Sequence, residues 1–364
     1  MKGPLQGLRI VEIKGIGPAP FCGMHFADLG AEVILIEREG PPFNDGLKGL
    51  LKRGKRSVTM DLKDPVCQQK LLKLIKSADG LIEGMRPGVM ERLGLGPDIC
   101  LKENPKLIYG RITGWGQEGP LSQTAGHDNN YASISSALFL ASAEGQAPIA
   151  PPTLLADIGG GAHYLMIGML SALRQVQETG KGDVIDAAMV DGSAHMMNLV
   201  LDLVGSGAMN GIKRGIGLLD GPHYYHTYVC SDGGYITFGA LEKQFYVEFL
   251  GLMGLQVDPD FNDQHSVVSW PKQKAKLAGL FVTKPRDHWV KLFEGSDACI
   301  APVLNVEEAV QHPHNVARNV FFQDHGYVEV RAAPCFQNYD TPTPPDIPEK
   351  GGDNEWLEAE LAKL

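Results

Sequence analysis

The sequence predicts an α/β protein with a large doubly wound domain and a smaller α+β domain. Its 364 residues exceed what one hydrophobic core usually organises, so two domains are expected. Strand and helix patterns alternate over residues 1–190, which is typical of a parallel sheet with crossover helices. The pattern then changes to glycine-rich sequence followed by a hairpin signal, and this change predicts the second domain.

The alternation begins at the N-terminus. Residues 8–13 (LRIVEI) are a β-branched run, an amphipathic stretch follows over 20–29, and the apolar run 33–36 predicts a second strand. The other predicted elements of this region are helices near 66–76, 88–102 and 153–176, and strands near 79–82, 107–112 and 183–190. This order predicts a parallel sheet that helices cover on both faces.

The hairpin signal is Ser231-Asp232-Gly233-Gly234, which separates two short apolar runs at 224–230 and 234–239. The predicted helices after it lie near 242–253, 271–282 and 286–294, and a short helix ends the chain. Strands followed by helices in this order predict a small α+β domain.

Composition excludes several function classes. A net charge of -10 disfavours nucleic acid and anionic membranes as partners, because both need a surplus of Lys and Arg. The six cysteines have no Cys-x-x-Cys spacing, and the pairs His223/His226 and His312/His314 lack companion ligands, so we expect no metal. No apolar run approaches a membrane span, and we expect a cytoplasmic protein. The final Ala362-Lys363-Leu364 resembles a peroxisomal address and favours that compartment as the alternative.

The first βα turn only partly matches a dinucleotide-binding fingerprint. Gly15 and Gly17 are in place, and Glu37 stands where a ribose-binding acid would. The third glycine is replaced by Pro20, and Arg38 follows the acid. The sequence therefore does not favour a nicotinamide site.

A basic cluster stands out in this acidic chain: Lys52, Arg53, Lys55 and Arg56 surround Gly54, and Arg38 and Arg86 belong to the same signal. Four neighbouring cations repel one another unless an anion shares the site, and the phosphates of coenzyme A would supply one. A solvated basic loop explains the same residues equally well.

Three residues could carry acid/base chemistry. His127 in GHDNNY (126–131) opens a predicted helix, whose N-terminal dipole favours the neutral imidazole that a base requires, although a lone His is usually structural. Asp157 lies among apolar residues ahead of three glycines, where it either caps a helix or favours its protonated form near a ligand. Glu242 stands between a predicted strand and helix, as a capping carboxylate would.

Seven motifs, in order, closely resemble the α-methylacyl-CoA racemases of the family III CoA-transferase superfamily. They span nearly the whole chain: RGKRS (53–57), RPGVMERLGLGP (86–97), LIYGRITGWGQEGP (107–120), GHDNNY (126–131), LLADIGGG (154–161), GKGDVIDAAMVDG (180–192) and GALEKQFY (239–246).

The resemblance implies a Rossmann-like large domain built from both chain ends and an interlocked homodimer with the active site between subunits. The expected division is a large domain over 1–190 completed by 325–364, a linker over 191–224, a small domain over 225–310 and a return linker over 311–324.

The resemblance also implies roles for individual residues. His127 and Asp157 match the acid/base pair, and Glu242 of the partner subunit matches the residue that hydrogen-bonds to His127. The positions that match coenzyme A contacts are Arg38, Thr59, Met60, Asp61, Leu62, Glu83, Gly84, Met85, Arg86, Gly126, Asp128, Asn129, Asn130 and Tyr131. Coenzyme A belongs to the acyl-CoA substrate, so no separate cofactor is expected.

The expected reaction inverts the carbon next to the thioester carbonyl. Its weakly acidic proton needs a base on one face, an acid on the other and donors at the enolate oxygen, for which backbone amides of 157–161 are one source. The chief rival is a CoA-transferase in which Asp157 forms an acyl-anhydride. A non-catalytic CoA-binding scaffold is the third alternative.

Overall fold

The computed structural model describes residues 3–40, 49–141, 145–323, 326–339 and 345–364. The chain forms two compact units. The first contains residues 1–138, 150–196 and 314–364, and the second contains 139–149 and 197–313. Residues 139–149 thus belong to the second unit although they precede residues 150–196 of the first.

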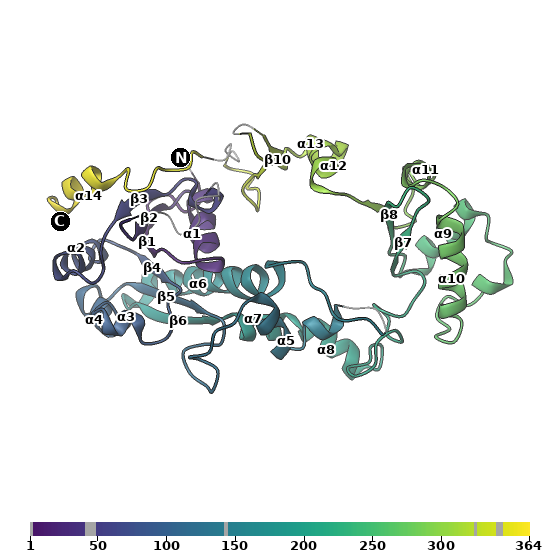
Figure 1. Ribbon diagram of the computed structural model, residues 1–364, viewed down its shortest axis with the longest axis horizontal. Coiled ribbons are helices and arrows are strands. Elements are labelled where there is room, and N and C mark those ends of the chain that lie inside the picture. Colours follow the sequence, from purple (N-terminus) through teal and green to yellow (C-terminus); the bar gives the residue numbers. More distant parts are fainter. Residues whose placement is uncertain (1–2, 41–48, 142–144, 324–325, 340–344) are drawn as a thin grey trace. The chain divides into compact units, whose positions relative to one another are not determined.

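A six-stranded parallel sheet forms the centre of the first unit (Figure 1). Its order is β3-β2-β1-β4-β5-β6, so the direction of winding reverses between β1 and β4. The strands are β1 (Arg9–Ile13), β2 (Glu32–Glu37), β3 (Arg56–Thr59), β4 (Gly80–Glu83), β5 (Ile108–Thr113) and β6 (Asp183–Ala188). Most of their side chains are buried, as expected for a sheet covered on both faces.

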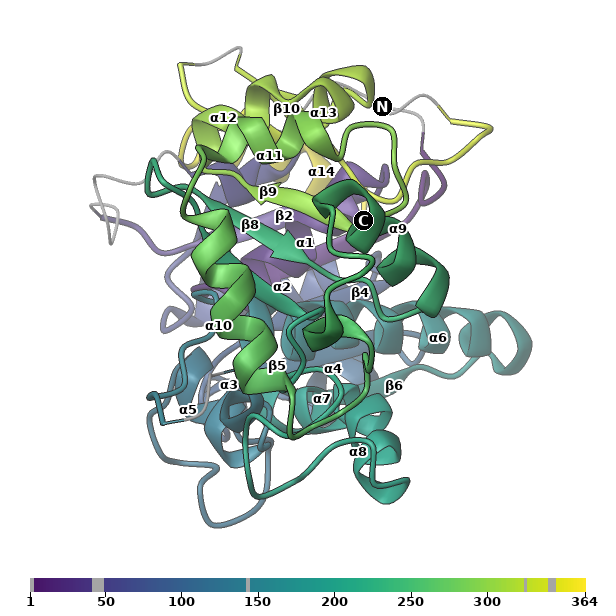
Figure 2. The same cartoon turned by 90° about the vertical axis from the view of Figure 1, so that its right-hand side faces the viewer.

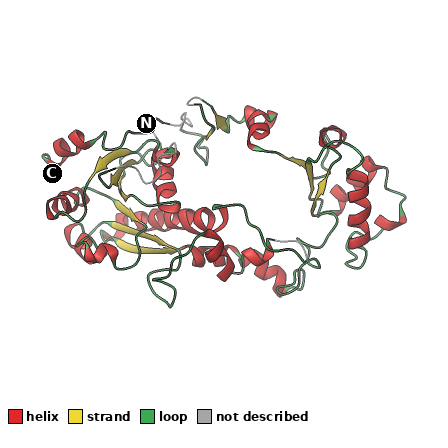
Figure 3. Ribbon diagram, in the orientation of Figure 1, coloured by secondary structure: helices red, strands yellow, loops and turns green. Residues whose placement is uncertain are grey.

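Helices cover both faces of this sheet (Figures 1 and 3). One face packs on α1 (Pro18–Asp28) and α6 (His163–Thr179). The other face packs on α2 (Pro65–Ile75), α3 (Val89–Arg92), α4 (Pro97–Glu103) and α14 (Asn354–Leu361). Along β1, Val11 and Ile13 enter the second core while Ile10 enters the first, which follows from the two-residue period of a strand.

The C-terminal segment packs against β3, at the edge of the sheet. Asp353 accepts a hydrogen bond from the Ser57 amide at 2.8 Å, and the Asn354 side chain exchanges hydrogen bonds with Thr59. Arg56 lies over the ring of Trp356 at 4.2 Å from its centroid. These contacts confirm a Rossmann-like large domain built from both chain ends.

The second unit contains a three-stranded antiparallel sheet in the order β7-β8-β9 (Figure 2). Its strands are β7 (His226–Val229), β8 (Tyr235–Phe238) and β9 (Ile300–Val303), and its helices are α9 (Lys243–Met253), α10 (Trp270–Phe281) and α11 (Arg286–Leu292). The predicted hairpin turn is confirmed, with the Cys230 amide bonded to the Gly234 carbonyl. Aromatic rings fill the core, and Phe238 stacks on Phe249 at 3.8 Å.

The other elements are α5 (Asp128–Ile134), the π-helix η3 (Leu154–Ala162), α7 (Met189–Met196), α8 (Asn198–Gly205), α12 (Val306–Gln311), α13 (Pro313–Ala317), β10 (Phe321–Phe322), β11 (Glu329–Val330) and the 3₁₀ turns η1 (Leu50–Lys52), η2 (Leu138–Leu140) and η4 (Pro259–Phe261).

Three predicted elements need correction. The helix expected over 88–102 is two helices, because the chain turns at Gly94 with a left-handed φ of 69°. The helix expected over 153–176 begins as a π-helix and becomes α-helical only at His163. Strand β3 was not predicted at all, because its residues follow directly on the basic cluster.

Candidate active site

The carboxyl ends of the six parallel strands form one edge of the large sheet. In open α/β sheets, ligands bind outside this edge where the winding reverses, which here is between β1 and β4. The turn that leaves β1 ends at Gly17, and the turn that leaves β4 carries Gly84, Met85 and Arg86. The fold therefore brings these two turns to the same edge of the sheet, at the point where ligands are expected.

Arg38 and Arg86 are exposed at this edge, directly after β2 and near the end of β4. Among the described residues, neither guanidinium has a hydrogen bond or an ion pair. Two unpaired guanidinium groups in an acidic protein are suited to bind phosphates.

Glu83 is placed differently from its predicted neighbours. Its side chain is buried and bonds to the guanidinium of Arg111 at 2.8 Å and to the Met85 amide at 2.6 Å. Burial raises the pKa of Glu83, and the bonds to Met85 and Arg111 oppose that rise. The carboxylate thus holds the turn after β4 in place, whereas Gly84 is exposed.

Of the predicted basic cluster, Arg38 and Arg86 remain unpaired among the described residues, as an anion site requires. The four cations around Gly54 form neither an unpaired anion site nor a solvated loop. Each cation pairs with a carboxylate of the sheet or of its flanking helices: Lys52 with Glu37, Arg53 with Asp28, Lys55 with Glu12, and Arg56 with Glu32 and Asp353. Arg53 and Lys55 are buried. The excess of cations disappears because their partners come from elements distant in sequence.

Glu37 is not available to a ribose. Its buried carboxylate is bonded to Lys14, to Lys52 at 2.9 Å and to the Ser57 hydroxyl at 2.6 Å. Burial by itself would raise its pKa, but these hydrogen bonds lower the pKa of Glu37 to about 2. The dinucleotide interpretation therefore loses its acid as well as its third glycine.

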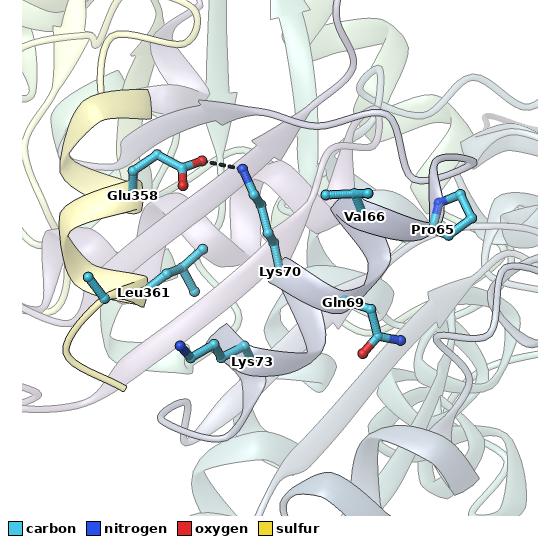
Figure 4. Close-up of a pocket in the computed structure, with 8 residues that line it drawn as sticks. Pro65, Val66, Gln69, Lys70, Lys73, Glu358 and Leu361 are labelled. Carbon is cyan, nitrogen blue, oxygen red and sulfur yellow. Dashed lines mark hydrogen bonds and ion pairs between the residues drawn. The ribbon is translucent and has the colours of Figure 1, made fainter.

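Thr59 and Met60 line a hollow of about 320 Å³ between the end of β3 and α14. Met60 is buried and Thr59 is bonded to Asn354, while Asp61 is exposed and Leu62 half-buried. A neighbouring groove of about 630 Å³ separates α2 from α14, where Lys70 points to Glu358 (Figure 4). Neither His127 nor Asp157 lines this groove.

His127 precedes α5, as the sequence predicted for a residue that opens a helix. Its ring is exposed, and its amide donates to Asn130 at 3.0 Å. The next turn is anchored by Tyr131, whose hydroxyl bonds to the Gly126 carbonyl and whose ring packs edge-on against Trp115. Asn129 and Asn130 are exposed.

Asp157 lies in the π-helix η3, beside the turn that leaves β1. A Cβ atom placed on Gly17 would lie 3.5 Å from its carboxyl oxygen Oδ2, so the carboxyl group sits against the backbone of this turn. Gly17 has a left-handed φ of 68°. Sequence reasoning considered Gly17 only as part of a dinucleotide motif and missed this contact.

The glycines after Asp157 serve packing. A Cβ on Gly160 would lie 2.5 Å from the Ser193 hydroxyl, and one on Gly192 would lie 1.8 Å from the Gly160 carbonyl. Helices η3 and α7 thus touch through backbone. The amides of Ala156 and Asp157 donate to Asp128, and that of Ile158 donates to Thr153. The amides of residues 157 and 158 are thus already bonded within the chain. The expectation that they donate to an enolate oxygen is therefore wrong.

The surroundings of Asp157 make it a usable acid and base. Burial and the nearby charge of Asp128 raise the pKa of Asp157 to about 6, and the charge of His127 opposes the rise. A carboxyl group with this pKa can give and take a proton near neutral pH. The fold thus brings His127 and Asp157 into one electrostatic environment.

Glu242 belongs to the second compact unit. It directly precedes α9, and its side chain is exposed and makes no capping hydrogen bond. The capping interpretation is therefore wrong, and the carboxylate is free for another partner.

The described residues contain neither a cluster of metal ligands nor a helix suited to span a membrane. In the part of the chain that the structure describes, no three His, Cys, Asp or Glu side chains gather as metal ligands would. His223 is buried and bonded to the Tyr246 hydroxyl at 2.8 Å, and burial lowers its pKa to about 3. None of the described helices combines the length and apolarity needed to cross a bilayer.

The sheet order and the polar groups at its carboxyl edge define a doubly wound α/β protein whose winding reverses between β1 and β4. The chain belongs to CoA-transferase family III, whose model matches residues 5–354. It is 41% identical over 345 residues to the alpha-methylacyl-CoA racemase of Homo sapiens, covering 94% of this chain and 88% of that protein. It is 28% identical to the acetyl-CoA:oxalate CoA-transferase of Acetobacter aceti, with 94% and 91% covered.

A solved structure extends this likeness to three dimensions. The crystal structure of a CAIB/BAIF family protein from Brucella suis has a TM-score of 0.84 and 26% sequence identity, and the match covers 99% of this chain and 100% of that chain.

Proposed function

We propose that the protein is a racemase that inverts the α-carbon of 2-methylacyl-CoA thioesters. The observation that carries the proposal is the position of the Asp157 carboxyl group against the turn at Gly17, where the charge of His127 acts on it and its pKa is raised to about 6. The 41% identity to a protein named alpha-methylacyl-CoA racemase supports the same reaction.

The reaction needs two groups that exchange roles. With one hand of the substrate, His127 removes the α-proton and Asp157 returns a proton to the opposite face; with the other hand the roles reverse. The pair must therefore hold one proton between them in the active form.

Coenzyme A would be held by residues at the carboxyl edge of the large sheet. The unpaired guanidinium groups of Arg38 and Arg86 are suited to its phosphates, and the exposed backbone at Gly84 lets the chain approach it closely. The hollow beside Thr59 and Met60 adjoins the same edge. We propose no separate cofactor, because coenzyme A enters as part of the acyl-CoA substrate.

We propose a homodimer in which Glu242 of the partner subunit bonds to His127. Two features support it. Helix α8 has a predominantly apolar sequence, yet none of its residues is buried within the described chain, and Leu199 is 70% exposed. The exposed carboxylate of Glu242, which does not cap its own helix, is also accessible to a partner subunit. A cytoplasmic compartment stays a prediction, with the peroxisome as the alternative.

The rival function is CoA transfer between carboxylic acids through an Asp157 acyl-anhydride. The relationship to a protein named acetyl-CoA:oxalate CoA-transferase supports it. An exposed imidazole whose charge acts on the carboxyl group favours proton transfer, because an anhydride mechanism has no evident need for it. A scaffold without activity would bind the thioester and leave its α-proton in place.

One experiment separates these functions. A single-handed 2-methylacyl-CoA is incubated with the protein in heavy water, with and without a free carboxylic acid as acceptor. Racemisation predicts deuterium at the α-carbon and loss of handedness without the acceptor. Acceptor-dependent formation of a new thioester with no α-deuterium would replace the proposal by transfer, and binding without either reaction would leave the scaffold.

A further inference from the structure

Asp128 has an arrangement that coenzyme A binding does not explain. It is 6% exposed and occupies the first position of α5, directly after His127. Its carboxyl oxygen Oδ1 accepts two hydrogen bonds, from the amides of Ala156 at 2.7 Å and Asp157 at 2.9 Å. The side chain therefore links α5, which follows His127, to η3, which carries Asp157.

The second carboxyl oxygen of Asp128 is unusual. Oδ2 is buried and has no hydrogen-bond partner among the described residues. Burying an oxygen of a carboxylate without a partner is costly, so its presence calls for an explanation, of which a catalytic role is one. An asparagine would make the same two bonds to the amides with its carbonyl oxygen, so the anchoring alone does not require a charge at this position.

We infer that Asp128 is a positioning residue, which fixes the Asp157 turn through two backbone amides and holds a second negative charge against its carboxyl group. This inference rests on the proposed acid/base role of Asp157 and deepens it. The resemblance implied that Asp128 contacts coenzyme A. This inference instead assigns Asp128 to the proton-transfer pair.

The charges around Asp157 are few. Asp128 at the start of α5 and His127 just before it act on the Asp157 carboxyl group with opposite signs. Burial and, to a smaller extent, the charge of Asp157 raise the pKa of Tyr131 on α5. The adjoining turn of α1 contributes Gly17, which has no side chain. Removing the charge of Asp128 therefore leaves only the charge of His127, which lowers the pKa of Asp157.

The test separates anchoring from charge with two variants. Asp128→Asn keeps an acceptor for the two amides and removes the charge, whereas Asp128→Ala removes both. Asp98→Asn is the matched control, because it makes the same charge change at an exposed site on α4, on the opposite face of the sheet. Carbon-13 NMR of aspartate-labelled protein follows the Asp157 carboxyl group, which is assigned with Asp157→Asn.

The expected results are specific. In Asp128→Asn, the pKa of Asp157 falls from about 6 towards the ordinary 3.8, and the acid limb of kcat/KM for α-deuterium exchange moves to lower pH by the same amount. Asp128→Ala lowers kcat/KM roughly 10²-fold, because the turn loses its anchor. Asp98→Asn changes neither.

Two outcomes would overturn the inference. One is an unchanged Asp157 titration in Asp128→Asn, and the other is a full kcat/KM with an unshifted pH profile in both Asp128 variants. The NMR titration does not depend on turnover, so it decides the role of Asp128 even if Asp128→Ala fails to fold. Absence of α-deuterium in the wild-type protein would contradict the proposed racemase function and leave the titration result standing.

Discussion

Two carboxyl groups of the large unit, the buried Glu12 and the half-buried Asp157, have contrasting surroundings. Glu12 is fully buried and forms an ion pair with Lys55, whose Nζ lies 2.5 Å from its Oε2. Asp157 is half-buried and lies beside another carboxylate, that of Asp128. Burial raises the pKa of both groups; the charge of Lys55 opposes the rise at Glu12, whereas Asp128 increases it at Asp157.

The comparison distinguishes a structural pair from a chemical one. Lys55 also donates to the Pro20 carbonyl at 2.9 Å, and a Cβ on Gly23 would collide with Glu12, so this pair is packed between β1 and α1 and has no access to a ligand. Asp157 faces the turn at Gly17 and the exposed His127. A compensated charge stabilises the fold, whereas an uncompensated one is maintained at a cost in stability and supplies a proton donor.

The largest effect is expected on activity at the chemical pair. Asp157→Asn removes the titratable group and should lower turnover by roughly 10²- to 10⁴-fold, as loss of an acid/base residue does, and His127→Ala should do the same. Rates of α-deuterium incorporation into a 2-methylacyl-CoA measure this. Turnover within a factor of three of wild type in either variant would remove that residue from the mechanism.

The structural pair should show its effect in stability. Lys55→Met leaves the Glu12 carboxylate buried without its cation, which typically costs about 3 to 5 kcal/mol. Unfolding in urea measures the loss. The double variant Glu12→Gln/Lys55→Met is the control, and it should recover much of the stability because no charge remains buried. A single variant as stable as wild type would mean that the pair is not needed for folding.

Asp157→Asn should raise stability while it lowers activity. Because the pKa of Asp157 is higher in the folded chain (about 6) than its ordinary 3.8, the folded state binds more protons between these values. Stability contributed by this group therefore falls as pH rises through that window. After allowance for solvent screening, the variant should be about 1 to 2 kcal/mol more stable at pH 7. The difference should vanish below about pH 4, and a constant difference at all pH values would contradict this origin.

The smallest effect distinguishes unpaired from paired cations. Arg86→Ala and Arg38→Ala should each raise KM for acyl-CoA roughly tenfold, with kcat little changed, because one charge-assisted bond contributes about 1.4 kcal/mol. Arg56→Ala is the control: its guanidinium is engaged by Glu32, Asp353 and Trp356, so KM should stay constant. Steady-state kinetics decide, and an Arg56 effect equal to that of Arg86 would remove the distinction.

The sequence carried much of the fold because its signals are local. Apolar runs such as 8–13 and 107–112 have the length and β-branching of buried strands, and the Ser231–Gly234 turn has the composition of a hairpin. The π-helical start at Leu154 carries no comparable signal, since its residues equally suit an α-helix. Its geometry depends on the packing of Gly160 against α7.

For the site, the sequence by itself determined which residue types were present and where each stood relative to a strand or a helix end. It predicted that His127 opens a helix and that Asp157 lies among apolar neighbours. Only the tertiary structure decided which charges remain free. Lys55 and Arg86 are both cations near strand ends, yet one is buried against Glu12 and the other is exposed and unpaired among the described residues. The physical reason is that an ion pair depends on distance in space, and Glu12, the partner of Lys55, lies 43 residues away in the chain.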